Sequence, residues 1–146
     1  MKIEGDKSLS IRWALLASQA HGKSKSLNLL KSEDVINTLN SLRQLGISIS
    51  KENDSYYVEG KGFKGLKEPE NQLYFGNSGT GIRLMSGLLS IQNFSSSLTG
   101  DESLSKRPMK RIIEPLVKMG ANISGSEEEI ESETVYSNSV KARAAK

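Results

Sequence analysis

The chain has 146 residues, of which 36% are hydrophobic and 25% charged, enough for one domain with an apolar core. The absence of cysteine excludes disulfides, thiolate metal sites and a cysteine nucleophile. The net charge of +3 does not by itself indicate a nucleic-acid partner. There is no apolar run of the ~20 residues that cross a bilayer and no signal-peptide pattern, so we expect a cytoplasmic protein that does not bind membranes.

The first half of the sequence predicts two helices and three strands. Leu9, Trp13 and Leu16 recur at helical spacing, and Asp6 or Ser8 precedes them as the candidate N-cap. The strands are short and polar, and the last two resemble a hairpin. The expected ranges are 9–20 and 32–45 for the helices, and 26–30, 47–50 and 56–59 for the strands.

The second half of the sequence repeats this order and then loses its periodicity. Pro108 suits the first turn of the last helix. After Ser124 no pattern predicts an element, and we expect residues 125–146 to be a loose tail of uncertain structure. The expected ranges are 73–75, 97–99 and 122–124 for the strands, and 82–91 and 108–119 for the helices.

The two halves match each other as an internal repeat. Gly5 to Arg12 corresponds to Gly76 to Arg83, and Ser41 to Gly46 corresponds to Pro115 to Gly120, at offsets of about 71 and 74 residues. Each half has the order β-α-β-α-β-β. We therefore expect an α/β (α+β) fold in which residues 1–124 form part of one domain. Its two units span about residues 2–60 and 72–124.

Gly5 to Arg12 is a candidate anion site, because a glycine-containing turn leads directly into a helix. Such a turn offers backbone N–H groups and the positive end of the helix dipole. Lys7 adds a point charge, Ser8 adds a hydroxyl, and Arg12 can bind a phosphate with its forked guanidinium. The alternative is that Ser8 only caps the helix while Lys7 and Arg12 are solvated.

Gly76 to Arg83 is a second candidate, with three glycines and three small polar residues at a strand-to-helix turn. This composition is typical of a backbone nest that binds anions. No Gly-Lys-Ser/Thr follows, and the spacing is not G-x-G-x-x-G, so neither common nucleotide motif is present. The alternative is a plain tight turn that leaves Arg83 on the surface.

Leu98 to Met109 carries the basic pair Lys106-Arg107 at an expected helix start. Cations there face the positive end of the helix dipole, which is unfavourable unless an anion is bound. The alternative is a solvated pair. His21, the one histidine, follows a helix at an expected C-cap, where we expect a surface role. No metal-ligand spacing and no Ser-His-Asp arrangement is found.

Together the motifs GDKSLSIR, GNSGTGIR and LTGDESLSKRPM resemble the 5-enolpyruvylshikimate-3-phosphate synthases, in that family's order and spacing. The resemblance covers about residues 2–124. It implies transfer of the enolpyruvyl group of phosphoenolpyruvate to the 5-hydroxyl of shikimate 3-phosphate, with release of phosphate and without a cofactor or metal. It also implies a place in the shikimate pathway, which makes aromatic amino acids.

The resemblance also implies roles for individual residues. Lys7 would contact both substrates, and Ser8 and Arg12 would hold shikimate 3-phosphate. Gly79 and Arg107 would line the phosphoenolpyruvate pocket, in a loop that Asn77 and Thr80 shape. The substrate-binding residues predicted by the motifs and the resemblance together are Lys7, Ser8, Arg12, Asn77, Gly79, Thr80, Arg83 and Arg107.

Members of this family are far longer, with two domains of three βαβαββ units each. This chain would supply the substrate-binding part of the first domain and be incomplete for catalysis alone. The family's acid and base residues have no counterpart in it, so no catalytic residue is assigned. We expect a complementing segment or self-association. The alternatives are a non-catalytic anion-binding module and, because RNA 3′-terminal phosphate cyclases use similar repeats, an RNA-binding module.

Overall fold

The computed structural model describes residues 5–130 and 133–143, in two compact units, Met1–Lys67 and Glu68–Lys146. The boundary between the units falls in the interval that separates the two expected repeats. Within the part of the chain that the structure describes, no helix is both long and apolar enough to span a bilayer.

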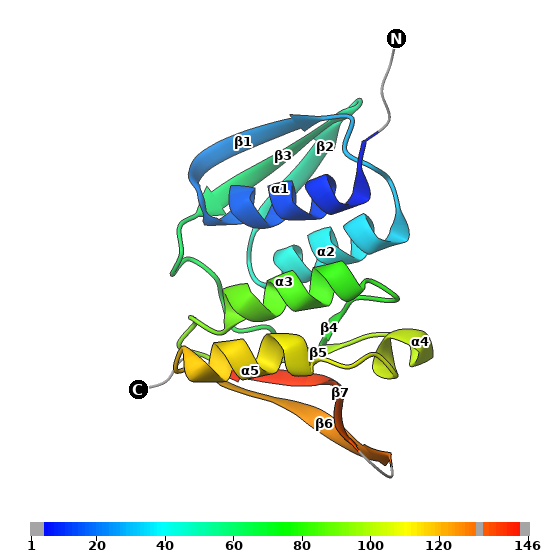
Figure 1. Cartoon of the computed structure of the whole chain (residues 1–146). Coiled ribbons are helices and arrows are strands. Elements are labelled where there is room, and N and C mark those ends of the chain that lie inside the picture. Colours follow the sequence, from blue (N-terminus) through cyan, green and yellow to red (C-terminus); the bar gives the residue numbers. More distant parts are fainter. Residues whose placement is uncertain (1–4, 131–132, 144–146) are drawn as a thin grey trace. The chain divides into compact units, whose positions relative to one another are not determined.

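The first unit packs two helices on one face of an antiparallel sheet of order β1-β3-β2 (Figure 1). The hairpin β2–β3 confirms the predicted hairpin. Helix α1 contacts both β3 and α2, so the core lies between the helices and the sheet. The elements are α1 (Lys7–Gln19), β1 (His21–Leu27), α2 (Glu33–Gln44), β2 (Ser48–Glu52) and β3 (Ser55–Lys61).

Strand β1 differs from its prediction over residues 26–30, because it begins at His21 and ends at Leu27. Ala20 is the C-cap of α1, so His21 lies in the strand and not at the end of the helix. The segment is almost entirely polar, so it lacks the alternation of apolar and polar residues that predicts a strand. Its seven-residue ladder with β3 holds it in place through backbone hydrogen bonds.

The second unit repeats this topology. Its sheet has the order β4-β5-β7-β6, in which β5, β7 and β6 pair antiparallel as β1, β3 and β2 do. Strand β4 adds a short parallel ladder to β5. The elements are β4 (Leu73–Tyr74), α3 (Gly79–Leu89), β5 (Ser96–Thr99), α4 (Glu102–Ser105), α5 (Lys110–Lys118), β6 (Asn122–Ile130) and β7 (Glu133–Arg143).

The segment after Ser124 is paired strand in the structure, where the sequence predicted no element. Strand β6 continues to Ile130, and β7 returns antiparallel to it, with an irregularity between Ser124 and Ser126. The segment is mostly polar, so the backbone ladder and not an apolar pattern defines it. Residues 131–132 and 144–146 lie outside the described residues. Pro108 precedes α5 and is not in its first turn.

Gly60 on β3 has no room for a side chain, because a Cβ would overlap the carbonyl oxygens of Ala17 and Ala20. We expect Gly60→Ala to lower the free energy of unfolding by about 1–3 kcal/mol, the usual cost of overpacking. Gly87 in α3 has nothing within 4 Å of its Cβ position. Gly87→Ala should therefore be stabilising by about 0.5–1 kcal/mol. Urea unfolding followed by circular dichroism checks both, and equal effects would contradict the packing described.

Candidate functional site

The first candidate site lies at the N-terminus of α1. Of the two candidate caps, Asp6 is the one in place, since its Oδ1 accepts a hydrogen bond from Leu9 N–H at 2.7 Å. Lys7 and Ser8 occupy the first turn, and the exposed Arg12 follows one turn later, its guanidinium 3.2 Å from the Ser8 carbonyl oxygen. The structure thus brings Lys7, Ser8 and Arg12 together at one helix end.

Lys7 is held by an ion pair that the sequence did not assign. Its Nζ lies 2.9 Å from Oδ2 of Asp34, in the first turn of α2. The Asp34 side chain is only 19% exposed and that of Lys7 is 49% exposed. Because the partly buried carboxylate limits where the long ammonium side chain can go, Asp34 positions Lys7 beside the α1 N-terminus.

The second candidate site lies at the N-terminus of α3 and corresponds to the first. Ser78 caps this helix, its Oγ accepting from Gly81 N–H at 3.1 Å. Gly79 and Thr80 are the first helical residues, and Arg83 lies one turn further on, as Arg12 does in α1. The positively charged side chain of Arg83 therefore lies near the positive end of the dipole of its own eleven-residue helix, α3.

Two guanidinium groups meet beside Gly79. A Cβ at this position would lie 3.1 Å from Nη1 of Arg107 and 3.5 Å from Nη1 of Arg83. Arg107 donates a hydrogen bond to Oδ1 of Asn77, and Arg83 Nη2 lies 3.5 Å from the Pro108 carbonyl oxygen. Five forked donors on each of two adjacent arginines suit a phosphate or carboxylate. The structure thus brings Asn77, Gly79, Arg83 and Arg107 together.

The two loops that carry these residues are tied by backbone hydrogen bonds. Phe75 N–H donates to Thr99 at 2.9 Å, and Asp101 N–H donates to Gly76 at 2.9 Å. Asp101 also caps α4 by accepting from Leu104 N–H at 2.7 Å. Because the parallel ladder ends where both loops begin, Arg107 is delivered to the same end of the sheet as Gly79.

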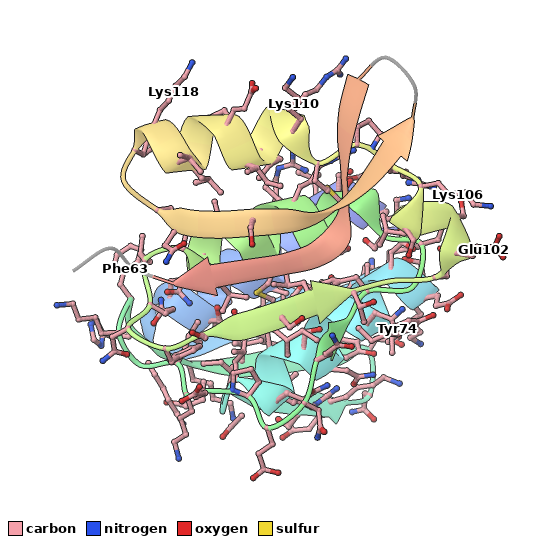
Figure 2. The ribbon with its side chains drawn as sticks, turned by 90° about the horizontal axis from the view of Figure 1, so that it is seen from below. Phe63, Tyr74, Glu102, Lys106, Lys110 and Lys118 are labelled. Carbon is pink, nitrogen blue, oxygen red and sulfur yellow. The ribbon has the colours of Figure 1, made fainter. Side chains whose placement is uncertain are left out.

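Lys106 does not share the environment of Arg107, and the prediction that this lysine faces the positive end of a helix dipole is wrong. Lys106 is the C-cap of α4, where a cation is favourable. Its Nζ forms an ion pair with Glu102 at 2.7 Å, and Figure 2 shows both side chains together on α4. Lys110 and Lys118 mark the two ends of α5 in the same view. The sequence predicted the helix over 108–119 and did not predict α4.

His21 is exposed and lies at the opposite end of α1 from Lys7. Among the described residues, no group of three or more histidine, aspartate or glutamate side chains is placed to hold a metal ion.

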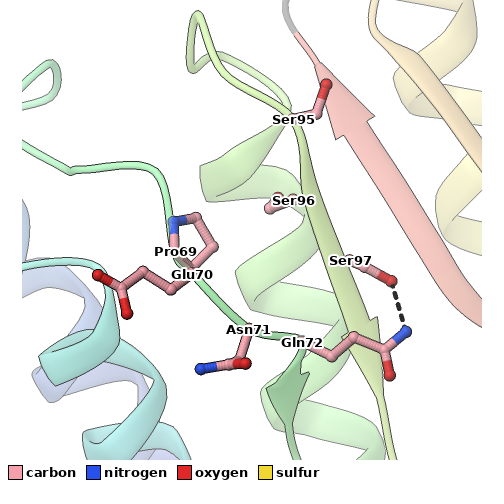
Figure 3. A pocket seen from close by; sticks show the side chains of 7 residues that line it. All are labelled: Pro69, Glu70, Asn71, Gln72, Ser95, Ser96 and Ser97. Carbon is pink, nitrogen blue, oxygen red and sulfur yellow. Dashed lines mark hydrogen bonds between the residues drawn. The ribbon is translucent and has the colours of Figure 1, made fainter.

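A separate hollow of about 400 Å³ opens at the other end of the β4–β5 ladder (Figure 3). Gln72 Nε2 donates to Ser97 Oγ at 3.1 Å and bridges the two segments that diverge there. The hollow is lined by hydroxyl and amide groups and the Glu70 carboxylate, with no arginine or lysine. It does not suit an anion and is distinct from the arginine pair.

The EPSP synthase profile (3-phosphoshikimate 1-carboxyvinyltransferase) matches residues 1–145 of this chain. The chain belongs to the EPSP synthase family. The 3-phosphoshikimate 1-carboxyvinyltransferase of Streptococcus pyogenes serotype M2 is 49% identical over 125 residues, covering 86% of this chain and 29% of that protein. The serotype M1 protein gives the same values.

Solved structures agree with this assignment. EPSP synthase from Acinetobacter baumannii superimposes with a TM-score of 0.90 at 41% sequence identity, over 99% of this chain and 32% of that one. A second structure of the enzyme from that organism gives 0.89. The EPSP synthase fold expected from the three motifs is confirmed. The chain spans about a third or less of the length of these relatives.

Gly79→Ala tests the arginine pair. The added Cβ would press on the Arg107 guanidinium, so we expect affinity for inorganic phosphate to fall about tenfold, equivalent to about 1.4 kcal/mol. Gly87→Ala, in the same helix but with open space around its Cβ position, is the matched control. Phosphate titrations monitored by NMR amide shifts measure both. Equal affinities in the two variants would show that Gly79 does not border the anion.

Proposed function

We propose that this chain supplies the substrate-binding part of a 3-phosphoshikimate 1-carboxyvinyltransferase. The enzyme would transfer the enolpyruvyl group of phosphoenolpyruvate to the 5-hydroxyl of shikimate 3-phosphate and release phosphate. The observation that carries the proposal is the convergence of Arg83 and Arg107 beside Gly79, at the N-terminus of α3. Family membership supplies the reaction class.

Phosphoenolpyruvate is assigned to the loop around Gly79. It carries a phosphate and a carboxylate on a three-carbon frame, and two neighbouring guanidinium groups match two such anionic groups. Asn77 accepts a hydrogen bond from Arg107, and this bond fixes the orientation of the Arg107 guanidinium group. Thr80, partly buried in the first turn of α3, contributes its hydroxyl to the same loop.

Shikimate 3-phosphate is assigned to the α1 N-terminus. Arg12 and the helix end would bind its phosphate, and Ser8 would donate a hydroxyl. Lys7, positioned by Asp34 at 2.9 Å, would stabilise negative charge on the substrate bound at this helix end. Proton transfer in the reaction still needs a positioned acid or base. We propose that these groups come from the rest of the transferase.

Titration of the chain with shikimate 3-phosphate, followed by heteronuclear NMR, tests the assignment directly. We expect amide shifts centred on Lys7, Ser8 and Arg12 in a dispersed spectrum. A dispersed spectrum without shifts at these residues would overturn the proposed substrate site.

Three alanine variants give a quantitative test of the α1 site. Lys7→Ala and Arg12→Ala should each weaken shikimate 3-phosphate binding at least about tenfold, because a hydrogen bond to a charged group contributes roughly 1.5–3 kcal/mol. His21→Ala should leave binding unchanged, since His21 lies at the other end of α1. Isothermal titration calorimetry provides the affinities. Equal losses in all three variants would mean a general loss of structure and not a site at Lys7.

The non-catalytic alternative makes a different prediction. An anion-binding module without the chemistry would bind shikimate 3-phosphate yet restore no turnover when mixed with the unmatched part of the Streptococcus pyogenes relative. Restored turnover, measured as phosphate release, would favour the transferase. A gel shift with single-stranded RNA that vanishes steeply with salt would instead favour the RNA-binding alternative.

A further inference from the structure

The outer face of the first sheet is the face that α1 and α2 leave uncovered (Figure 1). Tyr56 and Val58 are buried, so the alternation along β3 places Tyr57 and Glu59 on the outer face. A hollow of about 280 Å³ opens on this face, and we call it the sheet hollow. Its lining residues are Lys23 of β1, Ser48, Ile49 and Ser50 of β2, and Tyr57 and Glu59 of β3.

The strand register brings the two charged residues of the sheet hollow into one row. Glu59 on the central strand pairs with Lys23 on one side and with Ser48 on the other. Residues opposite each other in an antiparallel ladder have Cβ atoms about 5 Å apart. A basic, an acidic and a hydroxyl side chain therefore follow one another across three strands. Tyr57 lies two residues before Glu59 along β3, on the same face of the sheet.

The two charges of the sheet hollow do not neutralise each other. Lys23 Nζ lies 4.4 Å from the centroid of the Tyr57 ring, and Lys25 Nζ lies 5.5 Å from the same centroid. This cation–π contact draws the Lys23 ammonium group toward Tyr57. Within the part of the chain that the structure describes, neither Lys23 nor Glu59 takes part in an ion pair. Both side chains are exposed, so the sheet hollow offers one ammonium group and one carboxylate to a ligand.

We propose that the sheet hollow is a binding site for a free aromatic α-amino acid. The carboxylate of the ligand binds the Lys23 ammonium group, and the ammonium group of the ligand binds the Glu59 carboxylate, with the Ser48 hydroxyl beside it. A ligand with a single charge leaves the opposite charge of the hollow without a partner. The aromatic side chain packs on the Tyr57 ring in the edge-to-face or offset arrangement that aromatic pairs prefer. A volume of about 280 Å³ admits only a small ligand.

The sheet hollow is separate from the anion sites. Gly60, which follows Glu59, lies against the carbonyl oxygens of Ala17 and Ala20 at the C-terminal end of α1. Lys7 is at the N-terminal end of the same helix. None of the residues that line the hollow belongs to the proposed substrate sites. The inference therefore goes beyond the proposed transferase function and does not depend on it.

Titration of the chain with L-phenylalanine, followed by NMR amide shifts, tests the site. We expect saturable shifts at Lys23, Ser48 and Glu59, with a dissociation constant in the millimolar range. N-acetyl-L-phenylalanine lacks the ammonium group, and L-phenylalaninamide lacks the carboxylate. Each should bind about fivefold more weakly than L-phenylalanine, because each loses one exposed ion pair.

Two variants match each charge of the hollow to one group of the ligand. Glu59→Gln should weaken L-phenylalanine binding about fivefold and leave N-acetyl-L-phenylalanine unaffected. Lys23→Gln should weaken L-phenylalanine binding to the same extent and leave L-phenylalaninamide unaffected. Glu52→Gln is the matched control, because Glu52 is exposed on the same sheet but does not line the hollow. All three positions are exposed, so each variant should keep a dispersed spectrum.

Three results would overturn the proposal: no saturable shifts at the sheet hollow, equal losses in Glu59→Gln and in the Glu52→Gln control, or equal affinities for L-phenylalanine and N-acetyl-L-phenylalanine. The last of these would assign the hollow to a simple anion instead. Loss of shikimate 3-phosphate binding with intact L-phenylalanine binding would refute the proposed substrate and leave this site in place.

Discussion

The guanidinium groups of Arg83 and Arg107 both lie beside Gly79, close to the position that a side chain of residue 79 would occupy. Like charges at this separation repel, and each arginine is held by an oxygen acceptor, the Asn77 amide for Arg107 and the Pro108 carbonyl for Arg83. The arrangement is thus preorganised for an anion before one arrives. The other features of this loop, from the Ser78 cap to the short ladder of β4 with β5, keep the two arginines beside Gly79.

The first unit also places cations at a helix N-terminus, but it does so with different residues. An aspartate cap at position 6 replaces the serine cap at position 78, and both leave an arginine one turn into the helix. Lys7 has no basic counterpart at Ser78 and is held across the unit by Asp34. A repeated strand and helix scaffold therefore presents two helix N-termini, each with its own set of cations, as the proposed binding of two anionic substrates requires.

The proposed shikimate 3-phosphate site and two exposed leucines lie on the same helix, α1. Its first turn carries Lys7 and Ser8, and the side chains of Leu9 and Leu16 stand open beside them. A helix of this composition suits the interior of a larger assembly better than a surface. The chain covers 29% of the Streptococcus pyogenes relative and 32% of the Acinetobacter baumannii chain.

The sequence by itself determined the repeat, the helices other than α4, the β2–β3 hairpin and the motifs that indicate the family, because glycine turns, helical apolar spacing and cap residues are local signals. It missed elements without such signals. Polar β1 and the strands after Ser124 are held by pairing with distant backbone, and the short helix α4 was not predicted. Only the tertiary structure decided that Asp34 holds Lys7, that Arg107 and not Lys106 joins Gly79, and that Leu9 and Leu16 stay open. Each of these depends on which residues, far apart in sequence, the fold places side by side.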